Sequence, residues 1–123
     1  MKGSCNCGGV SFEVAGAPQG ASMCHCRQCR KQSGGVWSSA FVDEPNLTVH
    51  GDVAWYRSSA KAKRGFCPTC GAFLFWKHDD ETTISFALGA IDGLTGLKLE
   101  KHIFVADKGD YYDIADGIPQ KEN

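Results

Sequence analysis

Seven cysteines, all within the first 70 of 123 residues, place the strongest constraint on what this chain can fold into. An odd count argues against a fully paired disulfide scaffold, and the first residues, MKGSCNCGG, lack the apolar segment of a signal peptide. In a reducing compartment, clustered cysteines are typically metal ligands or reactive thiols. We therefore expect a soluble, cytoplasmic protein with metal sites. The cysteines fall into three groups: Cys5 and Cys7; Cys24, Cys26 and Cys29; Cys67 and Cys70.

Length and charge bound the remaining possibilities. A chain of this length with 42% hydrophobic residues can form one domain, which we place at residues 1–118, with residues 119–123 as a frayed tail. The net charge of -1 removes the basic field that nucleic-acid binders carry, and no apolar run is long enough to span a membrane. We expect neither nucleic acid nor a membrane as a partner.

Short runs of alternating or apolar residues between turn signals predict a mainly β fold. In Val10–Val14, apolar and polar side chains alternate, as in a half-buried strand. The only helix predicted is a turn or two at Arg27–Ser33. The predicted strands are Val10–Val14, Trp37–Val42, Leu47–His50, Val53–Arg57, Ala72–Trp76, Thr83–Leu88 and Leu99–Val105.

The first and last cysteine groups each place two thiols on one tight turn. Cys67 and Cys70 are spaced as in a zinc knuckle, and the glycine that follows permits the positive φ of such a turn. Cys5 and Cys7 supply a second pair, so that together the two groups complete a four-thiolate structural zinc site. Structural zinc contributes on the order of 10 kcal/mol of folding free energy in small domains. Disulfides, unligated thiols and an iron–sulfur cluster are the alternatives.

The middle group has three cysteines in a C-x-C-x-x-C pattern and no fourth ligand nearby in sequence. A second zinc held there would keep one coordination position open, and an open position permits Lewis-acid chemistry or binding of a substrate thiol. The alternatives are a redox-active trio, or a structural site closed by a distant histidine: His50, His78 or His102.

His25 lies between two of the proposed ligands, so it is poorly placed to bind the same metal. We expect this imidazole to be exposed, to support a ligand through a hydrogen bond, or to handle a proton. It is the remaining candidate catalytic residue.

Other polar and aromatic residues permit both a functional and a structural interpretation. Arg27, Arg30 and Lys31 lie beside the triad and could bind a carboxylate of an acidic thiol, or could simply be solvated. Trp37 is a candidate pocket residue, whereas the other two tryptophans are expected in the core. The basic cluster Lys61, Lys63 and Arg64 is interpreted as a solvated loop.

The cysteine groups and their flanks together resemble the glutathione-dependent formaldehyde-activating enzyme family, which is grouped with centromere protein V and has an Mss4-like fold. The matching segments are C-N-C-G at Cys5–Gly8, C-H-C-x-x-C-R-K-x-S-G at Cys24–Gly34, R-G-F-C-P-T-C-G at Arg64–Gly71 and the aromatic run Phe73–Trp76. The resemblance extends over essentially the whole chain and includes the late segments Lys101–Val105 and Tyr111–Asp113. Three groups in this order are highly specific, whereas any one alone is a weak signal.

The resemblance implies a fold of packed antiparallel sheets and two Zn²⁺ ions per chain. It implies a structural zinc on Cys5, Cys7, Cys67 and Cys70, and a catalytic zinc on Cys24, Cys26 and Cys29. The activity it implies is that of a carbon–sulfur lyase whose reverse reaction condenses formaldehyde with glutathione to give S-hydroxymethylglutathione. The alternative function is a non-catalytic, zinc-stabilised protein-binding module, and the fourth position of the second zinc distinguishes the two.

Overall fold

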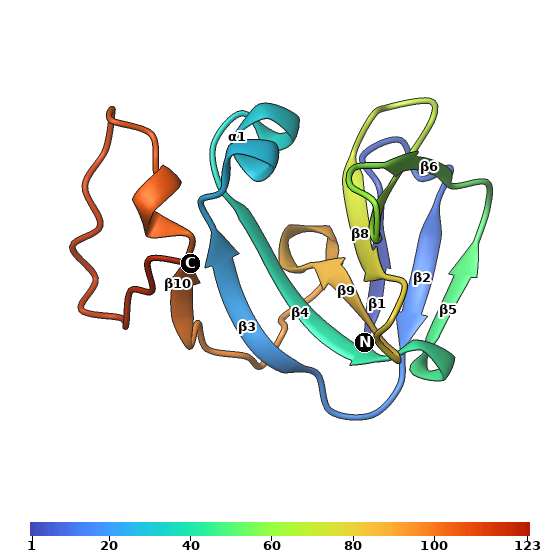
Figure 1. Cartoon of the computed structure of the whole chain (residues 1–123). Coiled ribbons are helices and arrows are strands. Elements are labelled where there is room, and N and C mark those ends of the chain that lie inside the picture. The colour runs from blue at the N-terminus through green and yellow to red at the C-terminus, as the bar shows by residue number, and fades with distance from the viewer.

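The structure, a computed structural model, describes residues 1–123 and contains two β-sheets and one α-helix (Figure 1). The smaller sheet has the strand order β1-β2-β5, and the larger has the order β10-β3-β4-β9-β8-β7-β6. The helix, α1, spans Arg27–Ser33, and three 3₁₀ turns lie at Glu44–Asn46, Leu88–Ala90 and Val105–Asp107. The strands are β1 (Lys2–Ser4), β2 (Ser11–Val14), β3 (Gln19–Cys24), β4 (Trp37–Asp43), β5 (Leu47–His50), β6 (Ala54–Arg57), β7 (Ala62–Phe66), β8 (Phe73–His78), β9 (Thr83–Ala87) and β10 (Lys101–Ile103).

The predicted fold class is confirmed, and each predicted strand is present with ends shifted by a few residues. Three further strands, β1, β3 and β7, were not predicted, because their small and charged residues lack apolar alternation. Their pairing partners hold them: β7, for example, lies between β6 and β8. The strand pairs are antiparallel, as expected, except that β10 pairs with β3 in parallel.

Aromatic side chains form the main core, which draws on strands of both sheets. Phe12 of β2 meets Phe75 of β8 edge to face with ring centroids 5.2 Å apart, and Phe86 of β9 completes the group. All three rings are almost fully buried. Burying a phenylalanine contributes about 1.5–3 kcal/mol, so this contact joins the two sheets firmly.

A glycine is required where the turn after β5 passes under the loop that follows Cys7. Gly51 has φ of 95°, and a Cβ placed on it would lie 2.1 Å from the carbonyl oxygen of Gly9. Any side chain would therefore push the first cysteine loop away from the sheet.

The C-terminal residues differ from the frayed tail expected from the sequence. The amide of His102 donates to the Pro119 carbonyl at 2.8 Å, and the amide of Lys121 donates back to the His102 carbonyl at 2.9 Å. The chain end thus lies along β10, opposite the smaller sheet (Figure 1). None of the helices has the length and apolar character that crossing a membrane would require.

Candidate metal centres

The first cysteine group and the last meet in the folded chain, as predicted. The four sulfur atoms of Cys5, Cys7, Cys67 and Cys70 all lie within 4.8 Å of one another. Cys7 Sγ lies 3.6 Å from Cys5 Sγ and 3.7 Å from Cys67 Sγ. A tetrahedral zinc with Zn–S bonds of about 2.3 Å separates its sulfurs by about 3.8 Å, whereas a disulfide bond is about 2.05 Å long. The spacing fits a four-thiolate metal site, and the disulfide alternative is wrong because all seven cysteines are free.

Backbone amides around this first cluster are directed at its sulfurs. Val10 N–H donates to Cys5 Sγ at 3.3 Å, and Gly9 N–H donates to Cys7 Sγ at 3.4 Å. Gly8 provides the positive φ, 80°, that the loop between them needs. Because N–H donors stabilise thiolate over thiol, the loop is already arranged for ionised ligands.

The electrostatics of the first cluster also suit a bound cation. Backbone hydrogen bonds from Ala72 and Cys7 lower the pKa of Cys70 to about 6. At Cys7 the Gly9 amide favours the thiolate, but the side chains of Cys5 and Cys67 outweigh it and raise the pKa to about 11. Crowded thiols cannot all ionise without a compensating positive charge, and a divalent metal supplies it.

The second cluster is built by the connection from β3 to α1. Cys24 is the last residue of β3, Cys26 is the N-cap of α1, and Cys29 lies one helical turn later. The three sulfurs lie within 4.8 Å of one another, and Cys29 N–H donates to Cys26 Sγ at 3.3 Å. Side-chain hydrogen bonds with Cys24 and Cys29 hold the pKa of Cys26 far below its usual range. Contacts with Cys26 and Cys29, and after them burial, raise the pKa of Cys24. The donor set again suits a thiophilic metal.

No fourth ligand from this chain joins the second cluster, so the alternative of a site closed by histidine is wrong. His50 is exposed on β5. His78 Nδ1 accepts a hydrogen bond from the Asp80 amide, and His102 is engaged by two other side chains. A metal on Cys24, Cys26 and Cys29 would retain an open position.

Arg64 belongs to this second cluster, and its interpretation as part of a solvated loop is wrong. It lies on β7, its side chain is buried, and Nη1 donates to Cys29 Sγ at 3.5 Å and to Gln32 Oε1 at 3.4 Å. The guanidinium also lies over the ring of Phe73, 5.2 Å from the centroid. Its positive charge therefore faces the thiolates directly.

His25 is buried, with 1% of its surface exposed, which rules out the exposed placement considered from sequence. Its Nε2 lies 2.9 Å from Nδ1 of His102, and its Nδ1 is hydrogen-bonded to the Tyr112 hydroxyl. Burial, and after it the nearby His102 and Lys108, lower the pKa of His25. The side chain thus points away from solvent into a polar network and supports the turn between two ligands.

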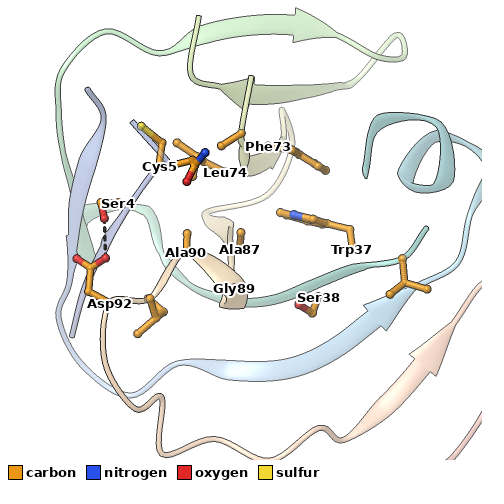
Figure 2. A pocket seen from close by; sticks show the side chains of 14 residues that line it. Ser4, Cys5, Trp37, Ser38, Phe73, Leu74, Ala87, Gly89, Ala90 and Asp92 are labelled. Carbon is orange, nitrogen blue, oxygen red and sulfur yellow. Dashed lines mark hydrogen bonds between the residues drawn. The ribbon is translucent and has the colours of Figure 1, made fainter. Parts of the chain in front are cut away.

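A cavity of about 500 Å³ is lined by Cys5 of the first cluster and by Trp37 and Phe73, among others (Figure 2). Trp37 and Phe73 stack at 4.1 Å on one side of it and pack against Cys24 and Cys29, while Cys5 lies on the opposite side. The buried indole N–H of Trp37 has no hydrogen-bond partner. Trp37 is therefore both a core and a pocket residue.

The remaining singled-out residues are placed less directly. Trp55 is 41% exposed on the edge strand β6, so the expectation that it is a core residue is wrong, and Lys63 lies over its ring. Trp76 is half-buried against the second cluster, as expected of a packing residue. On α1, Arg27 and Lys31 are exposed, whereas the Nε of Arg30 is buried without a partner.

The protein is thus a small β-sheet domain with two sets of cysteines, one of four and one of three, that could each hold a metal ion. Within that class, the chain belongs to the glutathione-dependent formaldehyde-activating enzyme family, whose model matches residues 1–107. Both clusters lie inside the matched range.

Individual relatives agree with this assignment. An uncharacterised lyase of Schizosaccharomyces pombe is 27% identical over 121 residues, covering 93% of this chain and 85% of the relative. A Halomonas elongata protein, provisionally named as a glutathione-dependent formaldehyde-activating enzyme, is 29% identical over 127 residues, covering 93% and 80%. The crystal structure of a Rhodobacter sphaeroides protein superposes with a TM-score of 0.63 at 26% identity, covering 78% of this chain and 92% of that one.

Proposed function

We propose that the protein is a zinc-dependent carbon–sulfur lyase that interconverts S-hydroxymethylglutathione with formaldehyde and glutathione. The observation that carries the proposal is the second cluster: three sulfurs converge and the chain supplies no fourth ligand. Trp37 and Phe73, which pack against Cys24 and Cys29, also line a cavity. The names of the family and of two relatives support the same reaction class. In the synthetic direction, the thiol sulfur forms a bond to the formaldehyde carbon, the carbonyl π electrons move to oxygen, and that oxygen takes up the proton that the thiol gave up.

The two clusters would have different tasks. Cys5, Cys7, Cys67 and Cys70 would hold a structural zinc that ties β1 and β2 to the turn between β7 and β8. Cys24, Cys26 and Cys29 would hold the second zinc, which supplies a Lewis acid that favours the thiolate form of the substrate.

The residues around the second cluster would position the thiol. Trp37 and Phe73 form a wall shared by the cavity and the cluster, so a thiol that reaches the cluster can place its body in the cavity. Holding two reactants in one orientation is itself a large contribution to rate. Arg64 keeps a positive charge beside the sulfurs throughout.

Both ring nitrogens of His25 are already hydrogen-bonded, to His102 and to Tyr112. We therefore assign the proton transfer to a water beside the cluster, and we give His25 a positioning role. The alternative function is a non-catalytic, zinc-stabilised binding module whose second zinc is closed or catalytically idle. The absence of a fourth ligand from the chain favours the enzyme over the closed site.

NMR exchange spectroscopy on formaldehyde, glutathione and their adduct tests this function. We expect the wild-type protein to accelerate the exchange and the Cys26→Ser variant to return it to the uncatalysed rate. Thr48→Ala, a change at an exposed position on β5, serves as the control and should match the wild type. A panel of other thiols, run alongside, identifies the preferred partner. Equal exchange in wild type and Cys26→Ser for every thiol would exclude the lyase function.

A further inference from the structure

Four side chains from distant parts of the sequence form one continuous hydrogen-bonded chain behind the second cluster. Asp116 Oδ2 lies 2.7 Å from His102 Nε2, and His102 Nδ1 lies 2.9 Å from His25 Nε2. His25 Nδ1 then contacts the hydroxyl of Tyr112. His25 and His102 are both buried, with 1% and 3% of their surface exposed.

The chemistry of these groups supports one assignment of donors and acceptors for the whole network. The hydrogen bond from His102 holds the pKa of the Asp116 carboxyl below its usual range, so Asp116 is ionised and can only accept. His102 then donates from Nε2, and we assign its Nδ1 as the acceptor for the Nε2–H of His25. The remaining nitrogen of His25 accepts from Tyr112, whose hydroxyl stays protonated because burial raises its pKa.

This network is attached to the turn that carries two of the proposed ligands. His25 stands between Cys24 and Cys26, and its backbone N–H donates to the carbonyl of Ile103 at 3.0 Å. Cys24 is also paired with Ile103 in the parallel ladder of β3 and β10. The turn is therefore fixed through its backbone by β10, and through the side chain of His25 by His102 of β10 and by Tyr112, which follows β10.

The two ends of the network come from a part of the chain that the family match does not cover. The match stops at residue 107, whereas Tyr112 and Asp116 lie beyond it. Within this segment, Lys108 donates to the carbonyls of Gly109 and Tyr112, and the backbone bonds between His102 and the residues Pro119 and Lys121 hold its far end against β10.

We propose that Tyr112 and Asp116 are positioning residues of the second metal centre: through His102 and His25 they hold the Cys24–Cys26 turn in its ligating geometry. The inference rests on the proposed metal site at the second cluster, though not on the identity of the reaction. Loss of groups that orient metal ligands typically costs about 10–100-fold in metal affinity, and we expect a loss in that range here.

Zinc competition with a chromophoric chelator, on the full-length chain, tests the inference. Asp116→Ala and Tyr112→Phe should each lower the affinity for one of the two zinc ions by about 10–100-fold and leave the affinity for the other unchanged. The matched control is Asp113→Ala, because Asp113 is an exposed aspartate of the same segment without a side-chain hydrogen bond. Cys26→Ser identifies which zinc belongs to the second cluster.

A second readout separates positioning from a general loss of structure. Imidazole ¹⁵N shifts should report the Nε2–H tautomer for both His25 and His102 in the wild type, and mixed tautomers in Asp116→Ala. Asp116→Asn keeps an acceptor oxygen without the charge and should recover part of the affinity. If Asp116→Ala bound both zinc ions as tightly as the wild type does, this inference would be overturned and the proposed function would stand. A wild type that binds a single zinc would overturn the second metal centre, and this inference with it.

Discussion

The guanidinium of Arg64 donates to the sulfur of Cys29 at 3.5 Å, across a separation of 35 residues in the sequence. Three thiolates exceed the charge of a divalent cation by one, and a buried positive group beside them offsets that excess. The contact therefore joins the larger sheet to α1 and also balances the charge of the second cluster.

Replacing Arg64 should weaken metal binding at the second cluster selectively. We expect Arg64→Met to lower zinc affinity there by about 10–100-fold, because the thiolates lose both a donor and a neutralising charge. Arg64→Lys keeps the charge but loses the planar guanidinium, so its zinc affinity should lie between those of the wild type and Arg64→Met. Chelator competition measures both, with the exposed Lys61→Met as the control. Unchanged affinity in Arg64→Met would show that the contact is only a packing contact.

Disrupting the first cluster should affect stability rather than the reaction centre. Cys67→Ser removes a buried ligand that ties the β7–β8 turn to the N-terminal strands, and we expect it to unfold the domain or to lower its melting temperature far more than Cys26→Ser does. Structural zinc contributes on the order of 10 kcal/mol in small domains. Thermal unfolding followed by circular dichroism compares the two variants. Equal melting temperatures would contradict the division into a structural and a catalytic cluster.

Trp37 should influence thiol recognition. Its ring stacks on Phe73 and lines the cavity, so Trp37→Ala should raise the thiol concentration needed for half-maximal exchange by about 2–10-fold, the value of one such aromatic contact. Trp55→Ala is the control, since that ring lies on the edge strand β6, away from this cavity. The measurement is the exchange rate as a function of thiol concentration at saturating formaldehyde. If Trp37→Ala and Trp55→Ala raised the thiol concentration for half-maximal exchange by the same factor, the cavity would not be the thiol site.

The cysteine clusters could be predicted from sequence because ligand pairs on tight turns are local features. The two pairs Cys5–Cys7 and Cys67–Cys70 are separated by some sixty residues. Only the fact that two pairs complete a site of four ligands indicated that they would meet. The strands with alternating or apolar runs could be predicted for the same reason. The pattern at Arg27–Ser33 likewise identified the helix that carries Cys29.

The sequence does not place Arg64 at the second cluster and leaves an exposed His25 possible, because the environments of both residues are made by distant partners. Arg64 is buried only because β7 is flanked by two strands and faces α1, and charged residues near Lys61 favoured a loop on local grounds. His25 is buried by partners that follow it by 77 and 87 residues. No local pattern connects such positions, so tertiary pairing overrode the local preference.

The central claim is that the second cluster binds a metal with one position open to a thiol. Cobalt substituted for zinc reports this directly, because its visible spectrum responds to each change of ligand. We predict that the wild-type protein takes up two cobalt ions and that added glutathione alters the spectrum of one of them. Cys26→Ser should show only the first-cluster spectrum, with no response to glutathione. A wild-type spectrum that is unchanged by glutathione and by every other thiol tested would contradict the account.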